Sequence, residues 1–501
     1  MKKYFKALPG WSSRKLIWLI IAAGIFMRVE LYRTNLVDID EYFSSYNIEN
    51  FRITEVFEPS GRDQAYNQAQ PTGFLIIENI IVKLFGPGKY MLRLFPFLCG
   101  IFSVLLFYKV AVLYCEPAAV PVALLFFAVS QQLIRYSSII KSYSCDVLIV
   151  LILLLGIKDL QEKPLNRLRA ILWGAAGSAA MWISHAAILV LPGLGLVLIL
   201  DTIRKKEEGK LGNLLLLSSV LAINLVFVYH AGLNALAGSK GGLCYWQDHF
   251  LSFKINGLAD LELYANALWN GFKTARVLPY AIAISMCAAG GIYMFVKRRR
   301  DFFYLISPVL FTVTASVLGK YPFYERLILF LVPIIIIFIA EGVGRVIKNR
   351  IAFYPGIILA ALLIFGTSRE AKDLLLDPAA QFDPIERYVS AKWRAGDILY
   401  TYYPANPASA GNFCSIGKTG LVLFVYAPDT VGYFNQEGKY NAVNDQAWNN
   451  PARDNQIWIG FFNVDVNKEK EILAGFDKGG VKVDRITASG RVFYLYKRKT
   501  A

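Results

Sequence analysis

The chain has 501 residues, of which 55% are hydrophobic and only 18% are charged, and its net charge is +16. A soluble core of this length would not need so much apolar sequence, so the composition predicts a polytopic α-helical membrane protein. The positive surplus is expected in cytoplasmic loops, and a nucleic-acid partner is excluded because no stretch interleaves Lys or Arg with aromatic residues.

The apolar segments predict about eleven transmembrane helices. The first follows a basic N-terminus and has no small-residue cleavage site after it, so we interpret it as an uncleaved helix rather than a signal peptide. The predicted spans are residues 16–32, 91–114, 118–134, 143–157, 171–183, 186–200, 211–229, 280–296, 302–318, 327–340 and 351–365.

Basic residues sort the connections between these spans onto two sides. Lys and Arg cluster in the segments 158–169, 204–210, 297–300 and 345–350, which are therefore expected to be cytoplasmic together with the N-terminus. This requires the apolar stretch 171–200 to form a helical hairpin that turns near His185. The outer side then receives loop 33–90, turns 135–142 and 319–326, loop 231–279 and the C-terminal region.

The first outer loop contains an acidic trio formed by Asp38, Asp40 and Glu41. Residues 74–85 are apolar but too short to span, which predicts helices that lie along the membrane surface. Asp38 is expected to cap one of them. Glu78 lies in this apolar piece, where an unpaired carboxylate is costly, so we expect a partner such as His249 or an arginine.

From about residue 369 the sequence changes character. Alternating segments at 397–403, 456–462, 481–486 and 491–496 predict strands, and residues 384–393 and 468–474 predict helices. We therefore expect a transmembrane domain over residues 1–368 and an extracytoplasmic α/β domain over residues 369–501.

No cofactor or metal is predicted, although metal dependence stays open. No cysteine pair has zinc-binding spacing, and the three histidines are far apart in the chain. Cys244 and Cys414 are the two cysteines of the outer segments, and a disulfide between them is one alternative.

Several short motifs, taken in order, carry a family resemblance. They are Asp40-Glu41, residues 70–73 (Gln-Pro-Thr-Gly), Arg93-Leu94, residues 135–138 with Lys141 and Tyr143, Tyr321-Pro322 with Arg326, and residues 395–397. Over nearly its full length the chain resembles the bacterial family 39 glycosyltransferases of the GT-C fold. These are related to protein O-mannosyltransferases and to the lipid A aminoarabinose transferase.

The resemblance implies an inverting transferase that moves a sugar from a polyprenyl-phosphate donor to an acceptor hydroxyl at the outer face of the bacterial inner membrane. Asp40 corresponds to the family's catalytic base and Glu41 accompanies it. This agrees with elementary chemistry, because sugar transfer needs a carboxylate to accept the hydroxyl proton and a group that stabilises the departing phosphate. The acceptor stays open between lipid, glycan and protein.

Cations at the outer ends of helices are candidates for binding the donor phosphate, since guanidinium and ammonium groups pair with phosphate oxygens. The alternative for each is snorkelling toward lipid headgroups. The phosphate candidates are Arg326, Lys141, Arg93, Arg135 and His185, and the further site candidates are Glu78, Tyr143 and His249.

Two departures from the family pattern limit this carry-over. Gln70 stands where some relatives have a lysine, and Ile139 stands where others have a glutamate. Two further functions remain alternatives, namely a polytopic transporter or flippase and a polyprenyl-linked glycan ligase. A transporter should place ionisable residues near the bilayer midplane, whereas the informative charges here are predicted at one outer face.

Overall fold

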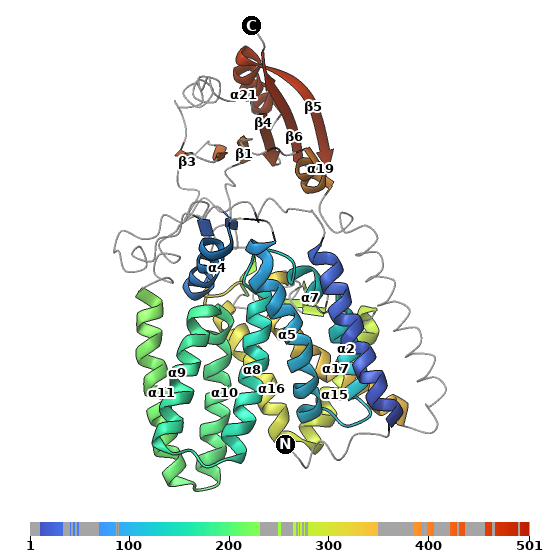
Figure 1. Ribbon diagram of the computed structural model, residues 1–501, viewed down its shortest axis with the longest axis vertical. Coiled ribbons are helices and arrows are strands. Elements are labelled where there is room, and N and C mark those ends of the chain that lie inside the picture. Colours follow the sequence, from blue (N-terminus) through green and yellow to red (C-terminus); the bar gives the residue numbers. More distant parts are fainter. Residues whose placement is uncertain are drawn as a thin grey trace.

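A bundle of helices carries a mixed β-sheet at one of its ends (Figure 1). The computed structural model describes residues 11–33, 41, 44–45, 48–49, 70–86, 88, 90–230, 249–251, 264–266, 269, 271–272, 275, 279–348, 384–392, 394, 398–404, 421–427, 430–435, 456–462, 466–488 and 491–499.

The helices of the bundle follow the apolar segments of the sequence. They are α2 (Trp11–Tyr32), α4 (Thr72–Phe85), α5 (Met91–Tyr114), α6 (Val120–Val129), α7 (Gln131–Tyr136), α8 (Tyr143–Glu162), α9 (Arg167–Ile183), α10 (His185–Arg204), α11 (Glu208–Val228), α15 (Tyr280–Lys297), α16 (Arg299–Val317), the 3₁₀-helix η5 (Glu325–Leu331) and α17 (Val332–Lys348). In the described part of the chain, helices occupy ten of the predicted spans, and the eleventh, residues 351–365, lies outside it. Five described helices are long and apolar enough to cross a membrane.

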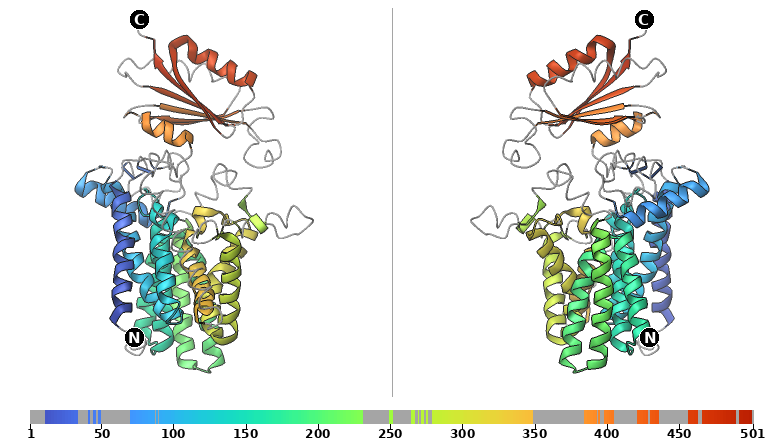
Figure 2. Two further views of the ribbon diagram at one scale, coloured as in Figure 1. Left: turned by 90° about the vertical axis from the view of Figure 1, so that its right-hand side faces the viewer. Right: turned by 90° about the vertical axis from the view of Figure 1, so that its left-hand side faces the viewer.

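The long helices alternate in direction, so the bundle has two distinct ends (Figure 2). The end beside the sheet, called the sheet end, holds the connections 137–142 and 318–324 and the break between α9 and α10 at Ser184. The opposite end, called the far end, holds the basic connections 163–166, 205–207 and Arg298. The predicted hairpin near His185 and the separation of basic connections from site candidates are confirmed; which end faces the cytoplasm stays a prediction.

The span predicted at residues 118–134 is wrong in one respect, because it is not one helix. It is broken at Ser130 into α6 and α7, and α7 extends into the predicted turn 135–142. The guanidinium of Arg28, fully buried on α2, donates to the carbonyl of Ala128 at 3.0 Å. It therefore satisfies a carbonyl that the end of α6 leaves without an intrahelical partner.

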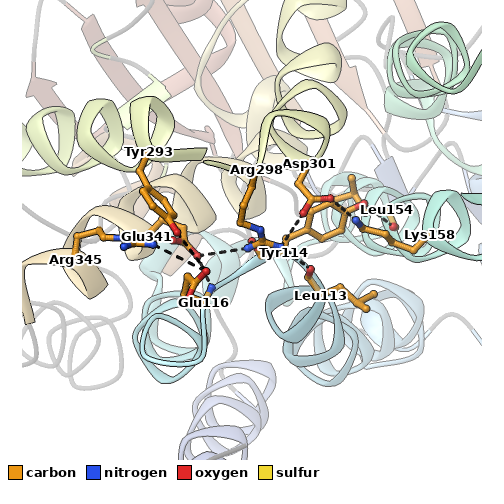
Figure 3. Close-up of polar contacts among 10 residues, drawn as sticks. All are labelled: Leu113, Tyr114, Glu116, Leu154, Lys158, Tyr293, Arg298, Asp301, Glu341 and Arg345. Carbon is orange, nitrogen blue, oxygen red and sulfur yellow. Dashed lines mark hydrogen bonds and ion pairs between the residues drawn. The ribbon is translucent and has the colours of Figure 1, made fainter. Parts of the chain in front are cut away.

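Hydrogen bonds and ion pairs connect several helices of the bundle at the far end (Figure 3). Arg298 donates to the carbonyls of Tyr114 (2.6 Å) and Leu113 (3.1 Å) at the end of α5, and to Asp301 (2.8 Å). Asp301 also pairs with Lys158 of α8. On the other side, Glu341 of α17 accepts a bond at 2.5 Å from the backbone N–H of Glu116.

Two glycines bring α15 and α17 into direct backbone contact. A Cβ at Gly290 would lie 1.9 Å from the carbonyl oxygen of Phe338, and one at Gly342 would lie 2.1 Å from that of Met286. Only glycine permits this approach, which, with the polar contacts, fixes the helices around α17 relative to one another.

The helix α4 lies at the sheet end and corresponds to the predicted surface helix 74–85 (Figures 1 and 2). Its buried side includes Phe74, Leu75 and Val82, while Leu84 and Phe85 are exposed. This two-sided pattern is typical of a helix that packs on a bundle and faces lipid or headgroups with its other side.

The C-terminal sheet has six strands in the order β3-β2-β1-β4-β6-β5. They are β1 (Ile398–Pro404), β2 (Leu421–Ala427), β3 (Thr430–Asn435), β4 (Ile457–Phe462), β5 (Gly480–Ala488) and β6 (Arg491–Arg498); β1 and β4 are parallel and the other neighbours are antiparallel. Helix α19 (Pro384–Lys392) covers the face toward the bundle and α21 (Val466–Gly479) the opposite face (Figure 2).

Both sheet faces are filled. Trp458, Phe493 and Leu495 pack on Ile385 and Val389 of α19, and on the other face Tyr400 and Tyr496 contact Phe476 of α21. The four predicted strands and both predicted helices are present, whereas β2 and β3 were not predicted. The proposed domain boundary at residue 369 falls outside the described residues.

Candidate functional site

Glu41, which follows Asp40 in the chain, lies in a buried polar cluster at the sheet end. Its two carboxylate oxygens accept bonds from Arg93, from Nε at 3.0 Å and from Nη2 at 2.6 Å. One of them also accepts the backbone N–H of Ile140 at 2.8 Å. Glu41 and Arg93 are both almost fully buried, so this is a bidentate ion pair shielded from solvent.

The segment after Glu41 is anchored by two more contacts. Gln70 donates from Nε2 to the hydroxyl of Ser44 at 3.0 Å and to the carbonyl of Ile140 at 3.4 Å, and Asn79 of α4 donates to the carbonyl of Ile48 at 2.7 Å. Gln70 therefore has a structural role at the position where relatives carry a lysine. We refer to Glu41, Ser44, Gln70, Arg93 and Ile140 as the Glu41 cluster.

Asp38 and Asp40 lie outside the described residues, so the structure does not test the capping role or the catalytic role. The Glu41 cluster nevertheless fixes the residue next to Asp40 between α5 and the connection 137–142. Lys141, another predicted site residue, directly follows Ile140 and is itself buried. The cluster thus brings the neighbour of the expected base close to an expected phosphate ligand.

A second group forms where α8 and α10 begin. Asp146, in the first turn of α8, accepts a bond at 2.6 Å from the hydroxyl of Ser184, which immediately precedes His185. Tyr143 begins the same helix, and its ring meets that of Tyr136 edge to face with centroids 5.1 Å apart. The beginnings of these two helices therefore carry two of the predicted site residues, Tyr143 and His185.

Arg326, in η5, and His249, which contacts the connection from α16 to η5, join this region. The His249 ring lies against Tyr324 with centroids 4.0 Å apart, and the carbonyl of His249 accepts the N–H of Phe323 at 2.9 Å. Burial raises the pKa of the nearby Tyr321 well above its ordinary value, and Asp146 and Tyr143 add to this shift. Tyr321 is thus within electrostatic reach of the first turn of α8.

Arg135 lies in the last turn of α7 at the same end, with its guanidinium 5.8 Å from the ring centroid of Tyr136. Because Tyr136 also contacts Tyr143, Arg135 lies on the side of the bundle where α8 begins. All the candidate cations therefore lie at the sheet end. They are Arg93, Arg135, Lys141, His185 and Arg326. The Glu41 cluster engages one of them, Arg93, directly.

Glu78 of α4 differs from the expectation. It is fully buried in an apolar cluster with Phe74 and Leu75, and among the described residues neither carboxylate oxygen has a hydrogen-bond partner. The expected partner, His249 or an arginine, is therefore wrong for the described part of the chain. Desolvation by burial raises the pKa of Glu78 to about 9, with a smaller contribution from Cys99, which favours the neutral form of this acid.

Other buried polar atoms at the sheet end also lack partners within the described residues. They are Gln70 Oε1, Gln131 Oε1 and Ser138 Oγ. Buried polar groups in folded proteins are normally satisfied, and water or a ligand is the usual partner where the protein supplies none. Unsatisfied buried atoms also occur at the far end, namely Gln161 Nε2, Tyr304 Oη and Glu341 Oε2, so those at the sheet end are candidate contacts for water or a ligand there.

Two charged residues of the helical bundle were missed by the sequence reasoning. Asp146 and Arg28 each stand inside an apolar span, and an ionisable residue in such a span is by itself a signal of function or of a specific polar contact. Both meet that expectation, since Asp146 bonds Ser184 and Arg28 bonds the end of α6.

Comparisons with known proteins identify the fold. No protein-family model and no curated protein sequence matches the chain. Among solved structures, ArnT from Cupriavidus metallidurans in the apo state is similar over 97% of this chain and 98% of its own, with a TM-score of 0.50 and 13% identity. ArnT bound to undecaprenyl phosphate gives a TM-score of 0.48, with 12% identity and coverage of 96% of this chain and 97% of its own.

The oligosaccharyltransferase of Archaeoglobus fulgidus, in complex with Zn and sulfate, gives a TM-score of 0.45 at 14% identity and covers 87% of this chain. The chain spans only 56% of the length of that protein. Among the described residues of this chain, no group of three or more His, Cys, Asp or Glu side chains is placed to hold a metal ion.

The likeness to ArnT over nearly both full lengths confirms the predicted GT-C fold. With its apolar helices, the chain is a polytopic α-helical membrane protein of that fold. At this identity the likeness concerns the fold alone, and it leaves the activity to be argued from the residues of this chain.

Proposed function

We propose that the protein is a membrane glycosyltransferase that moves a sugar from a polyprenyl-phosphate donor to an acceptor hydroxyl. The reaction takes place at the sheet end of the bundle, on the outer face of the bacterial inner membrane. The observation that carries this proposal is the gathering of Glu41 and the candidate cations at one end of the bundle, beside buried polar atoms that have no hydrogen-bond partner among the described residues.

The proposed base is Asp40. As the acceptor oxygen attacks the anomeric carbon, its proton passes to the Asp40 carboxylate, and the bond between that carbon and the phosphate oxygen breaks with its electron pair going to the phosphate. A single displacement of this kind inverts the anomeric centre. Glu41 is held by two donors of Arg93 and by the N–H of Ile140, so its role is to fix the backbone next to Asp40.

The departing phosphate is stabilised by cations of the same end. Arg326, Lys141, Arg135 and His185 are proposed to bind its oxygens, with Tyr143 and His249 completing the wall of the site. The buried ion pair with Glu41 favours a positioning role for Arg93 over phosphate contact. Such preorganised charges act strongly because they need no rearrangement as charge develops on the leaving oxygen.

The direct test is transfer itself. Purified protein is incubated with a set of polyprenyl-phosphate sugars and a membrane extract, and mass spectrometry identifies the component that gains the mass of one sugar. A gain on a lipid, glycan or protein supports the proposal and names the acceptor class. Movement of a solute or lipid across vesicles without any such gain would instead establish the transporter alternative.

Asp40→Asn tests the base. The substitution keeps the size of the side chain but cannot accept the proton, so turnover should fall by about 10² to 10⁴-fold with donor binding retained. Asp38→Asn, two residues away in the same acidic trio, is the matched control and should keep most of the activity. Unchanged turnover in purified Asp40→Asn would end the assignment.

Arg326→Ala tests the phosphate site. Loss of a guanidinium that binds phosphate should weaken donor binding by about tenfold or more, since charge-assisted bonds are the strong ones. Lys320→Ala removes an exposed cation six residues earlier and should leave donor affinity unchanged. Equal affinities of the two variants in a titration with the donor would remove Arg326 from the site.

A further inference from the structure

The turn between α15 and α16, at the far end, carries two exposed cations, Lys297 and Arg299. Most charges there are paired: Arg298 with Asp301, Arg300 with Asp201, and Lys158 with Asp301. Lys297 and Arg299, by contrast, are exposed and form no ion pair with any carboxylate of the described residues. Their two positive charges are therefore not paired within the described part of the chain.

Arg299 is held in place by aromatic rings. Its guanidinium carbon lies 5.1 Å from the ring centroid of Phe295 and 5.8 Å from that of Phe303, and the two rings contact each other. These cation–π contacts limit the positions of the guanidinium while leaving its N–H groups available. A planar, prepositioned guanidinium suits the oxygens of a phosphate group.

An apolar surface runs from this turn toward the middle of the bundle. On α15, Ile292 and Val296 are each 65% exposed, and their spacing of four residues places them on one face of that helix. On α16, Phe303 and Leu310 are also exposed and lie seven residues apart, which is about 10 Å along a helix. The exposed cations therefore stand at the end of an exposed apolar strip.

A membrane lipid joins a charged headgroup to apolar acyl chains. Exposed cations at the end of an exposed apolar strip can therefore bind both parts of an anionic lipid. We propose that the α15–α16 turn is a binding site for an anionic phospholipid of the leaflet at the far end. Lys297 and Arg299 contact the headgroup phosphate, and the acyl chains lie along Ile292, Val296 and Leu310. An anionic lipid fits better than a zwitterionic one because two unpaired cations attract net negative charge.

The site is separate from the transferase site, which lies at the opposite end of the bundle (Figure 2). Its test is therefore independent of the proposed reaction. The purified full-length protein is stripped of lipid and titrated with phosphatidylglycerol or with phosphatidylcholine of the same acyl chains, and native mass spectrometry measures the bound fraction. We expect phosphatidylglycerol to bind more tightly.

The double variant Lys297→Gln/Arg299→Gln should weaken phosphatidylglycerol binding by about tenfold, because each cation near an anionic headgroup contributes separately. The matched control is Arg204→Gln/Lys206→Gln, which removes two exposed cations from the end of α10 at the same end of the bundle. It should retain nearly the full affinity. Equal losses in the two double variants would show a general charge effect and overturn the site.

Arg299→Lys keeps the charge but loses the planar guanidinium held by the rings, so its affinity should lie between that of the unaltered protein and that of the double variant. A loss in this variant as large as in the double variant would mean that the aromatic packing, and not the charge, was disturbed, and would contradict the proposal. Equal binding of the two lipids by the unaltered protein would also overturn it. Displacement of phosphatidylglycerol by millimolar inorganic phosphate would point to a site for free anions in place of lipid.

Discussion

The two ends of the helical bundle differ in how their buried charged side chains are paired. At the far end, Arg298, Asp301, Lys158 and Glu341 each have a charged or backbone partner, and together they connect α5, α8, α16 and α17. At the sheet end, Glu41 pairs with Arg93 and Asp146 accepts a bond from Ser184, while Glu78 has no hydrogen-bond partner among the described residues.

This difference indicates that paired charges at the far end stabilise the fold, whereas polar groups at the sheet end serve binding. Paired charges at a helix end hold neighbouring helices in register, and close glycine contacts between α15 and α17 add to that rigidity. Unsatisfied polar groups do the opposite, since they cost free energy unless water or a ligand meets them. A rigid far end can therefore support a sheet end in which polar groups are kept available for binding.

The largest expected effect concerns the one tightly paired acid of the sheet end. Arg93→Met leaves the carboxylate of Glu41 buried without its cation, which should lower the free energy of unfolding by about 3 to 5 kcal/mol. The double variant Arg93→Met/Glu41→Leu removes both charges and should regain most of that loss. Chemical unfolding of the purified variants in detergent measures both, and a single variant as stable as the unaltered protein would show that the pair does not hold this region.

A somewhat smaller effect is expected from Gly290→Ala at the far end. The added Cβ would overlap the carbonyl oxygen of Phe338, so α15 and α17 must move apart, at a cost of about 3 kcal/mol. Gly291→Ala is the matched control, because the nearest atom to its Cβ is a Phe302 ring carbon at 4.0 Å. If both variants unfolded at the same temperature, the close contact would not be the source of rigidity.

The last effect is the most specific, and per pH unit it is the smallest: it is the pH dependence caused by Glu78. In the unfolded chain its carboxyl ionises near the ordinary value of 4.5, whereas in the folded protein burial raises its pKa to about 9. Between these values the folded protein holds a proton that the unfolded chain has released. The free energy of unfolding should therefore fall as pH rises, by up to about 1.4 kcal/mol per pH unit.

Glu78→Gln removes this titration, so the variant should show a flatter dependence between pH 5 and pH 8 and should be the more stable of the two at pH 8. Glu208→Gln, which alters an exposed acid at the far end, should leave the slope of the unaltered protein in place. Parallel slopes for Glu78→Gln and the unaltered protein would mean that a polar group or water satisfies Glu78 in solution.

Sequence reasoning recovered the elements that a local pattern encodes. The apolar runs predicted the helices from α2 to α17 because a span must be apolar along its length, and alternation predicted β1, β4, β5 and β6. It failed where the pattern is ambiguous. Strand β2 is a continuous apolar run, Leu421–Ala427, without alternation, and the break at Ser130 inside an apolar run has no strong local signal.

The sequence predicted which end of the bundle carries the site residues, but it did not predict their individual contacts. The side of the bundle could be predicted for Arg135, Lys141, His185 and Arg326, since charge in the connections sorts the two ends. The expected partner of Glu78 is not found among the described residues, because the burial of a single side chain depends on how α4 packs on α5 and α8. Asp146 was overlooked although it stands in an apolar span, where its charge is informative.

The sequence alone determined which segments are helices, which connections share an end and where the acidic and basic residues lie along the chain, because hydropathy and charge belong to each segment by itself. Only the tertiary structure decided that Glu41 pairs with Arg93, 52 residues away, and with the backbone of Ile140, 99 residues away. Such contacts depend on the packing of several helices at once, and no local pattern of residues specifies that packing.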